Sequence, residues 1–203
     1  MPRNASVTKN LIVINVIVFI ATLLNENFMM GTFALFYPGS YYFRWWQIIT
    51  HMFMHGGFWH IFFNMYTLYM FGSVVEEIIG PRKFLIYYFV CGLGAAGLHL
   101  GVEAIQVHFF ATALPPVVGA SGAIYGVLIA FAMLFPESRL TLLFPPITMK
   151  ARTMVIVFAA IELFTGITGL ADGIAHFAHL GGMLFGWLLI RYWRTQGTLF
   201  DRQ

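Results

Sequence analysis

The feature that most constrains this sequence is a series of six apolar runs with charged residues between them. A helix of about 20 mostly apolar residues spans the hydrocarbon core of a bilayer. The runs cover residues 10–28, 58–79, 84–105, 120–135, 153–170 and 174–193; the fourth is short, and the fifth carries one acid, Glu162. They lack the alternation of membrane β-barrel strands and exceed their span of about 10 residues. We therefore expect an all-α, polytopic membrane protein with a bundle of six transmembrane helices.

The basic residues predict the orientation of this bundle. With six spans, ten of the 11 Lys and Arg residues fall on one side of the membrane, and only Arg44 falls on the other. Because basic residues of short loops favour the cytoplasm, we expect both termini there. The loop 29–57 is then on the outer side, where Tyr41, Tyr42, Trp45 and Trp46 suit the membrane interface. Each of these rings taken alone could also be an ordinary aromatic anchor.

Composition excludes several other classes of protein. Only 9% of the residues are charged, which argues against an electrostatic nucleic-acid binder. The single cysteine, Cys91, cannot form an intrachain disulfide or a cysteine-based metal cluster. Arg3 and Lys9 precede the first run as in a signal peptide, but no small-residue cleavage site follows, so we expect a retained helix. Without repeats or a composition shift, residues 1–203 are expected to form a single membrane-embedded domain.

Polar side chains occur at three places in the apolar runs. His60 and Asn64 are four residues apart and so share one face of the second run. Ser121 stands beside a glycine at the start of the fourth run, with Tyr125 one turn further on. His179 lies near the start of the sixth run. Because polar groups in hydrocarbon are expensive, such residues usually mark a functional site.

The predicted topology places these residues at a common depth. The second, fourth and sixth runs all begin on the outer side, and His60, Ser121 and His179 lie within the first residues of those runs. The small residues Gly182 and Gly186 would let a neighbouring helix approach closely. A serine, a histidine and side-chain donors at one level are the set that acyl transfer needs: nucleophile, base and oxyanion hole.

Each residue also has a purely structural interpretation. Ser121 could be a small packing residue, and His179 could be a buried neutral imidazole. Asn64 could link two helices by hydrogen bonds. Tyr125 on its own is better interpreted as packing filler. Glu162 is better interpreted as structural, because it has no evident basic partner at its depth. The combination of motifs, rather than any one residue, favours catalysis.

The same motifs occur in the order and spacing of a known family. They are His51-Met-Phe-Met-His55 leading to His60-x-x-x-Asn64, Phe71-Gly72 with Glu76-Glu77 and Gly80, Gly119-Ala120-Ser121-Gly122-x-x-Tyr125-Gly126, and Ala178-His179-Leu-Gly181-Gly182-x-x-x-Gly186. Over a core of about residues 45–193 the sequence resembles the rhomboid intramembrane serine proteases, in their minimal six-span prokaryotic form.

This resemblance implies a serine endopeptidase that hydrolyses peptide bonds in or near transmembrane segments of membrane proteins. Ser121 would be the nucleophile and His179 the general base of a Ser-His dyad. His60 and Asn64, with the Ser121 N–H, would stabilise the oxyanion. The expected partners are transmembrane substrates and membrane lipid, with no cofactor, no metal and no nucleic acid. The sequence does not predict the oligomeric state.

The resemblance also implies supporting features. Tyr125 would position the His179 ring, with Gly119 beside it, and the fifth span with the loop 166–173 would gate substrate access. A minimal prokaryotic form implies a multi-pass protein of the bacterial inner membrane. Many family members carry Trp-Arg shortly before the first histidine, whereas Trp46-Gln47 stands here, a departure that affects how the loop 29–57 engages lipid.

Chemistry sets further expectations for the site. No acid is placed to orient His179 as in a three-member triad, so packing and Tyr125 would hold its ring. Hydrolysis needs water, and His51, His55 and Asn64 are candidates to line a polar pocket. We expect His176 to matter less than His179, because it lies elsewhere on the helix circumference.

Two rival functions remain open at this point. A metal-dependent membrane enzyme could use His51, His55, His60, His176 and His179, since neutral imidazoles bind zinc, although no His-Glu-x-x-His motif is present. A non-catalytic relative could bind membrane helices without cutting them. The presence of both Ser121 and His179 argues against that second rival.

Overall fold

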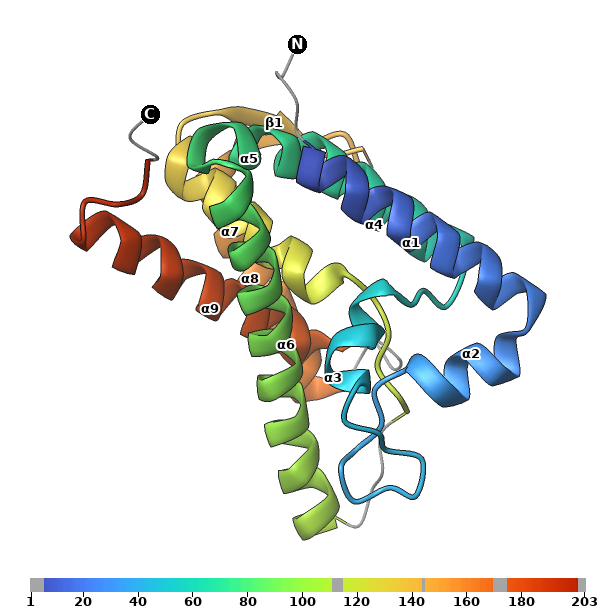
Figure 1. The fold of residues 1–203 in the computed structure, drawn as a ribbon. Coiled ribbons are helices and arrows are strands. Elements are labelled where there is room, and N and C mark those ends of the chain that lie inside the picture. The colour runs from blue at the N-terminus through green and yellow to red at the C-terminus, as the bar shows by residue number, and fades with distance from the viewer. Residues whose placement is uncertain (1–5, 111–114, 144, 170–174, 201–203) are drawn as a thin grey trace.

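The computed structural model describes residues 6–110, 115–143, 145–169 and 175–200, which are mostly helical (Figure 1). The helices are α1 (Ser6–Leu24), α2 (Glu26–Phe33), α3 (Gln47–Thr50), α4 (Phe58–Thr67), α5 (Ser73–Ile79), α6 (Pro81–Phe110), α7 (Ser121–Leu134), α8 (Ala151–Thr168) and α9 (His176–Thr195). A 3₁₀-helix, η1 (His51–Phe53), precedes α4, and a π-helix, η2 (Leu68–Gly72), joins α4 to α5. Two short strands are β1 (Arg139–Thr141) and β2 (Thr148–Lys150).

The predicted all-α membrane bundle is confirmed. Helix α4, η2 and α5 follow one another without a break and together form the second predicted span. Among the described residues, three helices, α1, α6 and α8, are each long and apolar enough to cross a membrane. Helix α7 is apolar but has only 14 residues, as its short run predicts. The predicted ends of the fifth and sixth spans, at residues 170 and 174, lie outside the described residues.

The predicted end of the first span is wrong. The chain leaves α1 at Leu24, and the Asn25 side-chain oxygen accepts a hydrogen bond from the Phe28 N–H at 3.2 Å. A side-chain acceptor at this position caps a new helix, and Glu26 favours its first turn. The predicted run 10–28 is therefore divided between α1 and α2.

A buried glutamate of α5 fixes the start of α1. The Glu76 carboxylate accepts hydrogen bonds from the Val7 N–H at 3.0 Å, the Thr8 N–H at 2.8 Å and the Thr8 hydroxyl at 2.7 Å. The first N–H groups of a helix have no partner within the helix. Glu76 thus caps the start of α1 from another helix.

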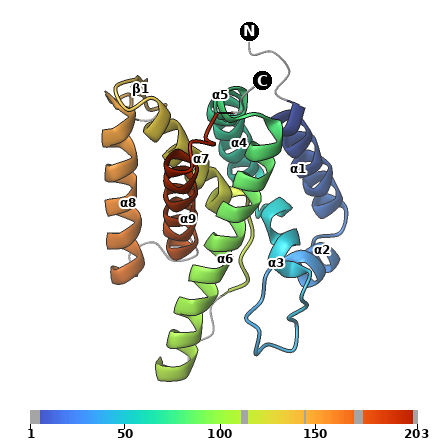
Figure 2. The same ribbon diagram turned by 60° about the vertical axis from the view of Figure 1, so that its left-hand side comes forward.

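The centre of the bundle is a close contact of α6, α7 and α9, with α8 at one edge and α1 at the other (Figure 2). Glycines make this contact possible. A Cβ atom on Gly182 of α9 would overlap the carbonyl oxygen of Gly122 of α7, and one on Gly186 would lie 3.1 Å from the Gly126 Cα. The close approach predicted at Gly182 and Gly186 is therefore confirmed.

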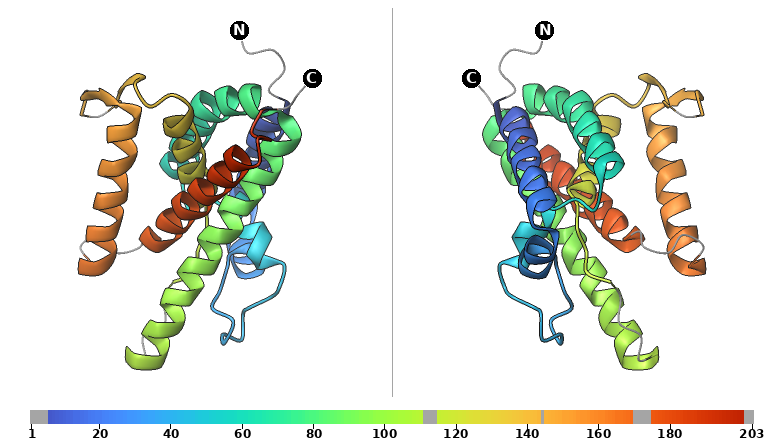
Figure 3. Two further views of the ribbon diagram at one scale, coloured as in Figure 1. Left: turned by 90° about the vertical axis from the view of Figure 1, so that its left-hand side faces the viewer. Right: turned by 90° about the vertical axis from the view of Figure 1, so that its right-hand side faces the viewer.

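The start of α1 and the end of α9 lie at the same end of the bundle, as an even number of spans requires (Figure 3). The start of α1, helix α5, the strands and the end of α9 lie at one end of the bundle, whereas α2 and α3 lie toward the other (Figure 3). The strands form an antiparallel hairpin in which Arg139 pairs with Lys150 and Thr141 with Thr148. This hairpin was not expected, but it lies in the loop between α7 and α8, so the spans themselves are helical as predicted.

The loop that follows α2 is organised around the residue that departs from the family pattern. Gln47 is fully buried, and its side-chain nitrogen donates to the Tyr42 carbonyl at 3.0 Å and the Thr32 carbonyl at 3.3 Å. Its oxygen accepts from the Arg44 N–H at 3.0 Å. Gln47 therefore acts inside the loop, while Tyr41 and Trp45 are 85% and 72% exposed at its surface.

Candidate active site

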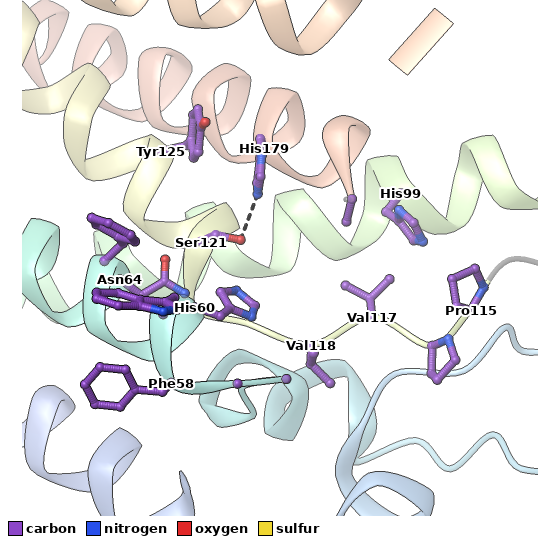
Figure 4. A pocket seen from close by; sticks show the side chains of 16 residues that line it. Phe58, His60, Asn64, His99, Pro115, Val117, Val118, Ser121, Tyr125 and His179 are labelled. Atoms are coloured by element: carbon purple, nitrogen blue, oxygen red, sulfur yellow. Dashed lines mark hydrogen bonds between the residues drawn. The ribbon is translucent and has the colours of Figure 1, made fainter. Parts of the chain in front are cut away.

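The structure brings Ser121 and His179 together from different helices. Ser121 is the first residue of α7, and His179 lies in the first turn of α9. The Ser121 Oγ is 2.8 Å from the His179 Nε2, within hydrogen-bond distance (Figure 4). The close glycine contact between α7 and α9 begins one residue after Ser121, at Gly122. Backbone approach therefore sets the distance between the hydroxyl and the imidazole.

The segment before Ser121 is held in a conformation that suits glycine. Gly119 has φ +128°, which residues with a Cβ rarely adopt, and its N–H donates to the His51 carbonyl at 2.9 Å. A Cβ there would also lie 2.8 Å from the His60 Nε2. Two residues further back, Val117 pairs with Leu35 through two backbone hydrogen bonds. The approach to Ser121 is thus tied to the loop after α2.

His60 and Asn64 face the same space from α4. Both line the pocket next to Ser121, and Figure 4 shows them on the side of Ser121 away from His179. Asn64 is buried, and its Nδ2 has no hydrogen-bond partner among the described residues. A buried donor without a partner is costly and usually has a reason. These two side chains are available to an oxygen atom placed beside Ser121.

The pocket has a volume of about 940 Å³ and is formed by α4, α6, α7, α9 and the segment before α7 (Figure 4). Ser121, His179, Tyr125, His60 and Asn64 contribute polar groups to its wall. His99 of α6 also lines it and is not among the site residues predicted from the sequence. His99 lies on the long third span, where its position relative to α7 depends on helix packing that local patterns do not encode.

Two histidines expected in this pocket lie elsewhere. His51 and His55 are buried and do not line it. The His51 Nδ1 lies 2.8 Å from the Gln47 carbonyl oxygen, and the His55 ring packs against His60 with centroids 5.0 Å apart. Burial lowers the pKa of His51 to about 4 and that of His55 to about 3, so both rings are neutral near pH 7. His55 thus contacts a residue of the pocket wall, whereas His51 contacts Gln47.

The Tyr125 ring lies flat against the His179 ring. Their centroids are 4.2 Å apart, and the planes differ by 8° (Figure 4). This is the arrangement that the family resemblance implies. The interpretation of Tyr125 as mere packing filler, drawn from the residue alone, overlooked that one turn of α7 brings its ring beside α9.

The expectation that no acid orients His179 is wrong. Glu162 of α8 is buried, and its Oε1 lies 2.9 Å from the His179 Nδ1. The same carboxylate also contacts His176 and Tyr125. Glu162 therefore has partners at its depth, but they are two imidazoles and a phenol rather than a lysine or arginine side chain.

The histidines of the metal-enzyme rival are divided between two parts of the site. His51 and His55 do not line the pocket, whereas His179 lines it and contacts Ser121 and Glu162. Within the described ranges, His, Cys, Asp and Glu side chains form no group of three that could hold a metal ion.

The sequence is similar to members of one known protein family. The sequence matches the family model of the Rhomboid domain over residues 42–195. It is 30% identical to the rhomboid protein YdcA of Bacillus subtilis over 149 residues, covering 72% of this chain and 66% of that relative. It is 32% identical to presenilin-associated rhomboid-like protein A, mitochondrial, of Danio rerio, covering 75% and 40%. Rhomboid protein 1, mitochondrial, of Saccharomyces cerevisiae is 30% identical, covering 70% and 41%. The chain thus spans less than two thirds of the length of each of these relatives.

Proposed function

Because this chain belongs to the rhomboid family, we propose that it is an intramembrane serine endopeptidase that hydrolyses peptide bonds in or near transmembrane segments. Ser121 is the proposed nucleophile and His179 the proposed general base. The observation that carries the proposal is the 2.8 Å distance between the Ser121 Oγ and the His179 Nε2 at the wall of a large pocket in the bundle.

In the first half of the reaction, the His179 Nε2 takes the hydroxyl proton as the Ser121 Oγ attacks the substrate carbonyl carbon. A serine hydroxyl is a weak nucleophile until an adjacent base accepts its proton. The tetrahedral intermediate then collapses, the peptide C–N bond breaks, and His179 returns the proton to the departing amine. The acyl group remains on Ser121.

Negative charge on the carbonyl oxygen is stabilised by donors already in place. The Asn64 Nδ2, His60 and the N–H groups at the start of α7 are the proposed donors. The positive end of the α7 dipole adds to their effect. Such donors act most strongly where water is excluded and where they need not reorganise during the reaction.

The second half of the reaction releases the acyl group. A water molecule in the pocket attacks the acyl carbon, with His179 again as the base, and Ser121 leaves with its proton restored. A substrate helix must unwind locally first, because helical peptide groups are already hydrogen-bonded. Transmembrane segments rich in small or helix-breaking residues are therefore the proposed substrates.

The proposed orientation places both termini in the cytoplasm. It rests on the ten-to-one distribution of basic residues. Reporter fusions at residues 82, 139 and 202 should report the cytoplasm, and one at residue 39 the opposite side. The family includes mitochondrial proteins as well as a Bacillus protein, and we propose the bacterial inner membrane for this chain by analogy with the Bacillus relative.

The proposed activity is tested by incubating the purified wild type, Ser121→Ala and His179→Ala with a panel of single-span membrane proteins. We expect the wild type to cleave some members, and each variant to lose all measurable cleavage while remaining folded. Activity within tenfold of the wild type in either variant would contradict the dyad. EDTA should leave the rate unchanged; a loss that added zinc restores would favour the metal-dependent rival.

A further inference from the structure

Glu162 of α8 makes polar contacts with both helices that carry the proposed dyad. Glu162 is 6% exposed and lies on α8, which forms one edge of the bundle (Figure 2). The Oε1 faces the His179 Nδ1 at 2.9 Å, and the Oε2 faces the His176 Nδ1 at 2.6 Å. The Tyr125 hydroxyl donates to the Oε1 at 2.5 Å. One carboxylate thus joins α7, α8 and α9.

The arrangement defines the protonation of His179. Its Nε2 faces the Ser121 hydroxyl, so it must be unprotonated to accept that proton. The proton of the neutral ring is then on the Nδ1, which is the atom that faces Glu162. Although the Nδ1–H does not point straight at the Oε1, catalytic hydrogen bonds are often poorly aligned in empty sites and tighten when substrate binds.

Glu162 is itself held in place by donors. An ionised carboxylate only accepts hydrogen bonds, so the Tyr125 hydroxyl and the His176 Nδ1–H both donate to it. The two contacts occupy different oxygens, which fixes the rotation of the carboxylate about its own axis. Tyr125 in addition stacks on His179, so the same phenol restrains the imidazole and its acidic neighbour.

We propose that Glu162 is a positioning residue that completes a Ser121–His179–Glu162 triad, with His176 as the anchor of its second oxygen. The proposal rests on the proposed function of Ser121 and His179. Glu162 holds His179 in the tautomer with the proton on the Nδ1 and stabilises the imidazolium that forms when Ser121 attacks. His176 then acts on the reaction through Glu162, which agrees with the expectation that it matters less than His179.

A purely structural role is the alternative to be separated from this one. A buried glutamate that links three helices would lower stability when it is changed, without a specific effect on turnover. Glu76 provides the matched control, because it is also buried and also accepts three hydrogen bonds between elements, at the start of α1. Glu76→Gln should lower the Tm and leave kcat per folded enzyme unchanged.

The test compares kcat, KM and Tm of purified Glu162→Gln, Glu76→Gln and the wild type in the substrate assay. Replacing the acid of a Ser-His-acid triad lowers kcat by about 10⁴-fold in other serine proteases. Because Tyr125 also restrains His179 here, we expect a smaller loss for Glu162→Gln, at least about 10²-fold in kcat with little change in KM. A kcat within threefold of the wild-type value would overturn the proposal. So would a loss of activity that is fully explained by a smaller fraction of folded protein.

A second pair of variants tests the anchor and remains informative if Glu162→Gln does not fold. In His176→Asn the amide nitrogen can replace the Nδ1–H as donor to Glu162, whereas His176→Ala removes it. We expect His176→Ala to lose about tenfold in kcat, the effect of losing one hydrogen bond to a charged group, and His176→Asn to recover most of it. Equal kcat values in the two variants would overturn the role of His176.

The design separates failure of this inference from failure of the proposed function. If Ser121→Ala is inactive while Glu162→Gln and His176→Ala turn over at the wild-type rate, only the triad is wrong. If Ser121→Ala cleaves as the wild type does, the proposed function is wrong, and the triad fails with it.

Discussion

The contact between Gly182 and Gly122 leads to the most specific structural prediction, because it sets the spacing of the helices that carry the dyad. A Cβ at residue 182 would overlap the Gly122 carbonyl oxygen, whereas carbon and neighbouring atoms pack at about 3.5–4.0 Å. In Gly182→Ala the two helices must therefore separate by about 1 Å or more. The Ser121–His179 distance of 2.8 Å would then exceed the limit of about 3.2 Å for such a hydrogen bond.

Two effects should follow, and both are measurable on the purified protein. Overpacking of this kind costs about 1–3 kcal/mol, so the Tm should fall. A misplacement of about 1 Å in a catalytic pair can lower the reaction rate by about 10²-fold. We therefore expect kcat to fall by about this factor while the variant remains folded.

The matched control is Gly97→Ala in α6, where a Cβ would meet nothing within 4 Å. This variant should keep the wild-type kcat, because only the alanine at residue 182 separates the two dyad helices. If Gly182→Ala retained at least half of the wild-type kcat, or if Gly97→Ala lost as much activity, helix spacing would not be what sets the dyad distance.

Two further predictions concern side chains around the site. Asn64→Ala should lower kcat with little change in KM, because its amide is expected to act mainly in the transition state; loss of one such donor typically costs about 10²–10³ in rate, and His60 and the Ser121 N–H would keep the loss near the lower end. A change in KM alone would mean that Asn64 contacts bound substrate uniformly. Gln47→Ala should lower the Tm, because it removes hydrogen bonds to part-buried carbonyl and N–H groups of the loop, which contribute about 0.5–1.5 kcal/mol each. An unchanged Tm would show that the loop does not depend on this side chain.

The sequence allowed much of the site to be inferred for a simple physical reason. His60, Ser121 and His179 each lie in the first turn of a helix, and the predicted topology starts those helices on one side of the membrane. Depth then follows from the helical rise and requires no knowledge of packing. The glycines of α9 were also informative, because a missing side chain in an apolar run predicts close approach.

The contacts of Glu162 could not be inferred in the same way. They join residues 14 and 37 positions apart and depend on how α8 is rotated about its axis against α7 and α9. The sequence does show an acid in an apolar run. Because an acid in hydrocarbon has a high free-energy cost, such a residue is expected to have polar partners. The partners that meet this demand are His176, His179 and Tyr125 rather than a lysine or arginine.

Other differences arose in the connections. The Asn25-Glu26 pair is a helix-start signal that would have ended the first span earlier. The burial of Gln47 was not predictable, because its partners are backbone groups brought together by the folded loop.

The central claim, that Ser121 is a nucleophile activated by His179, is tested most directly by mass spectrometry of the protein after treatment with a mechanism-based serine acylator. We predict one covalent adduct per wild-type chain, located on Ser121, no adduct in Ser121→Ala, and greatly slowed labelling in His179→Ala. An adduct on another residue, or labelling of Ser121 at the wild-type rate in His179→Ala, would contradict the claim.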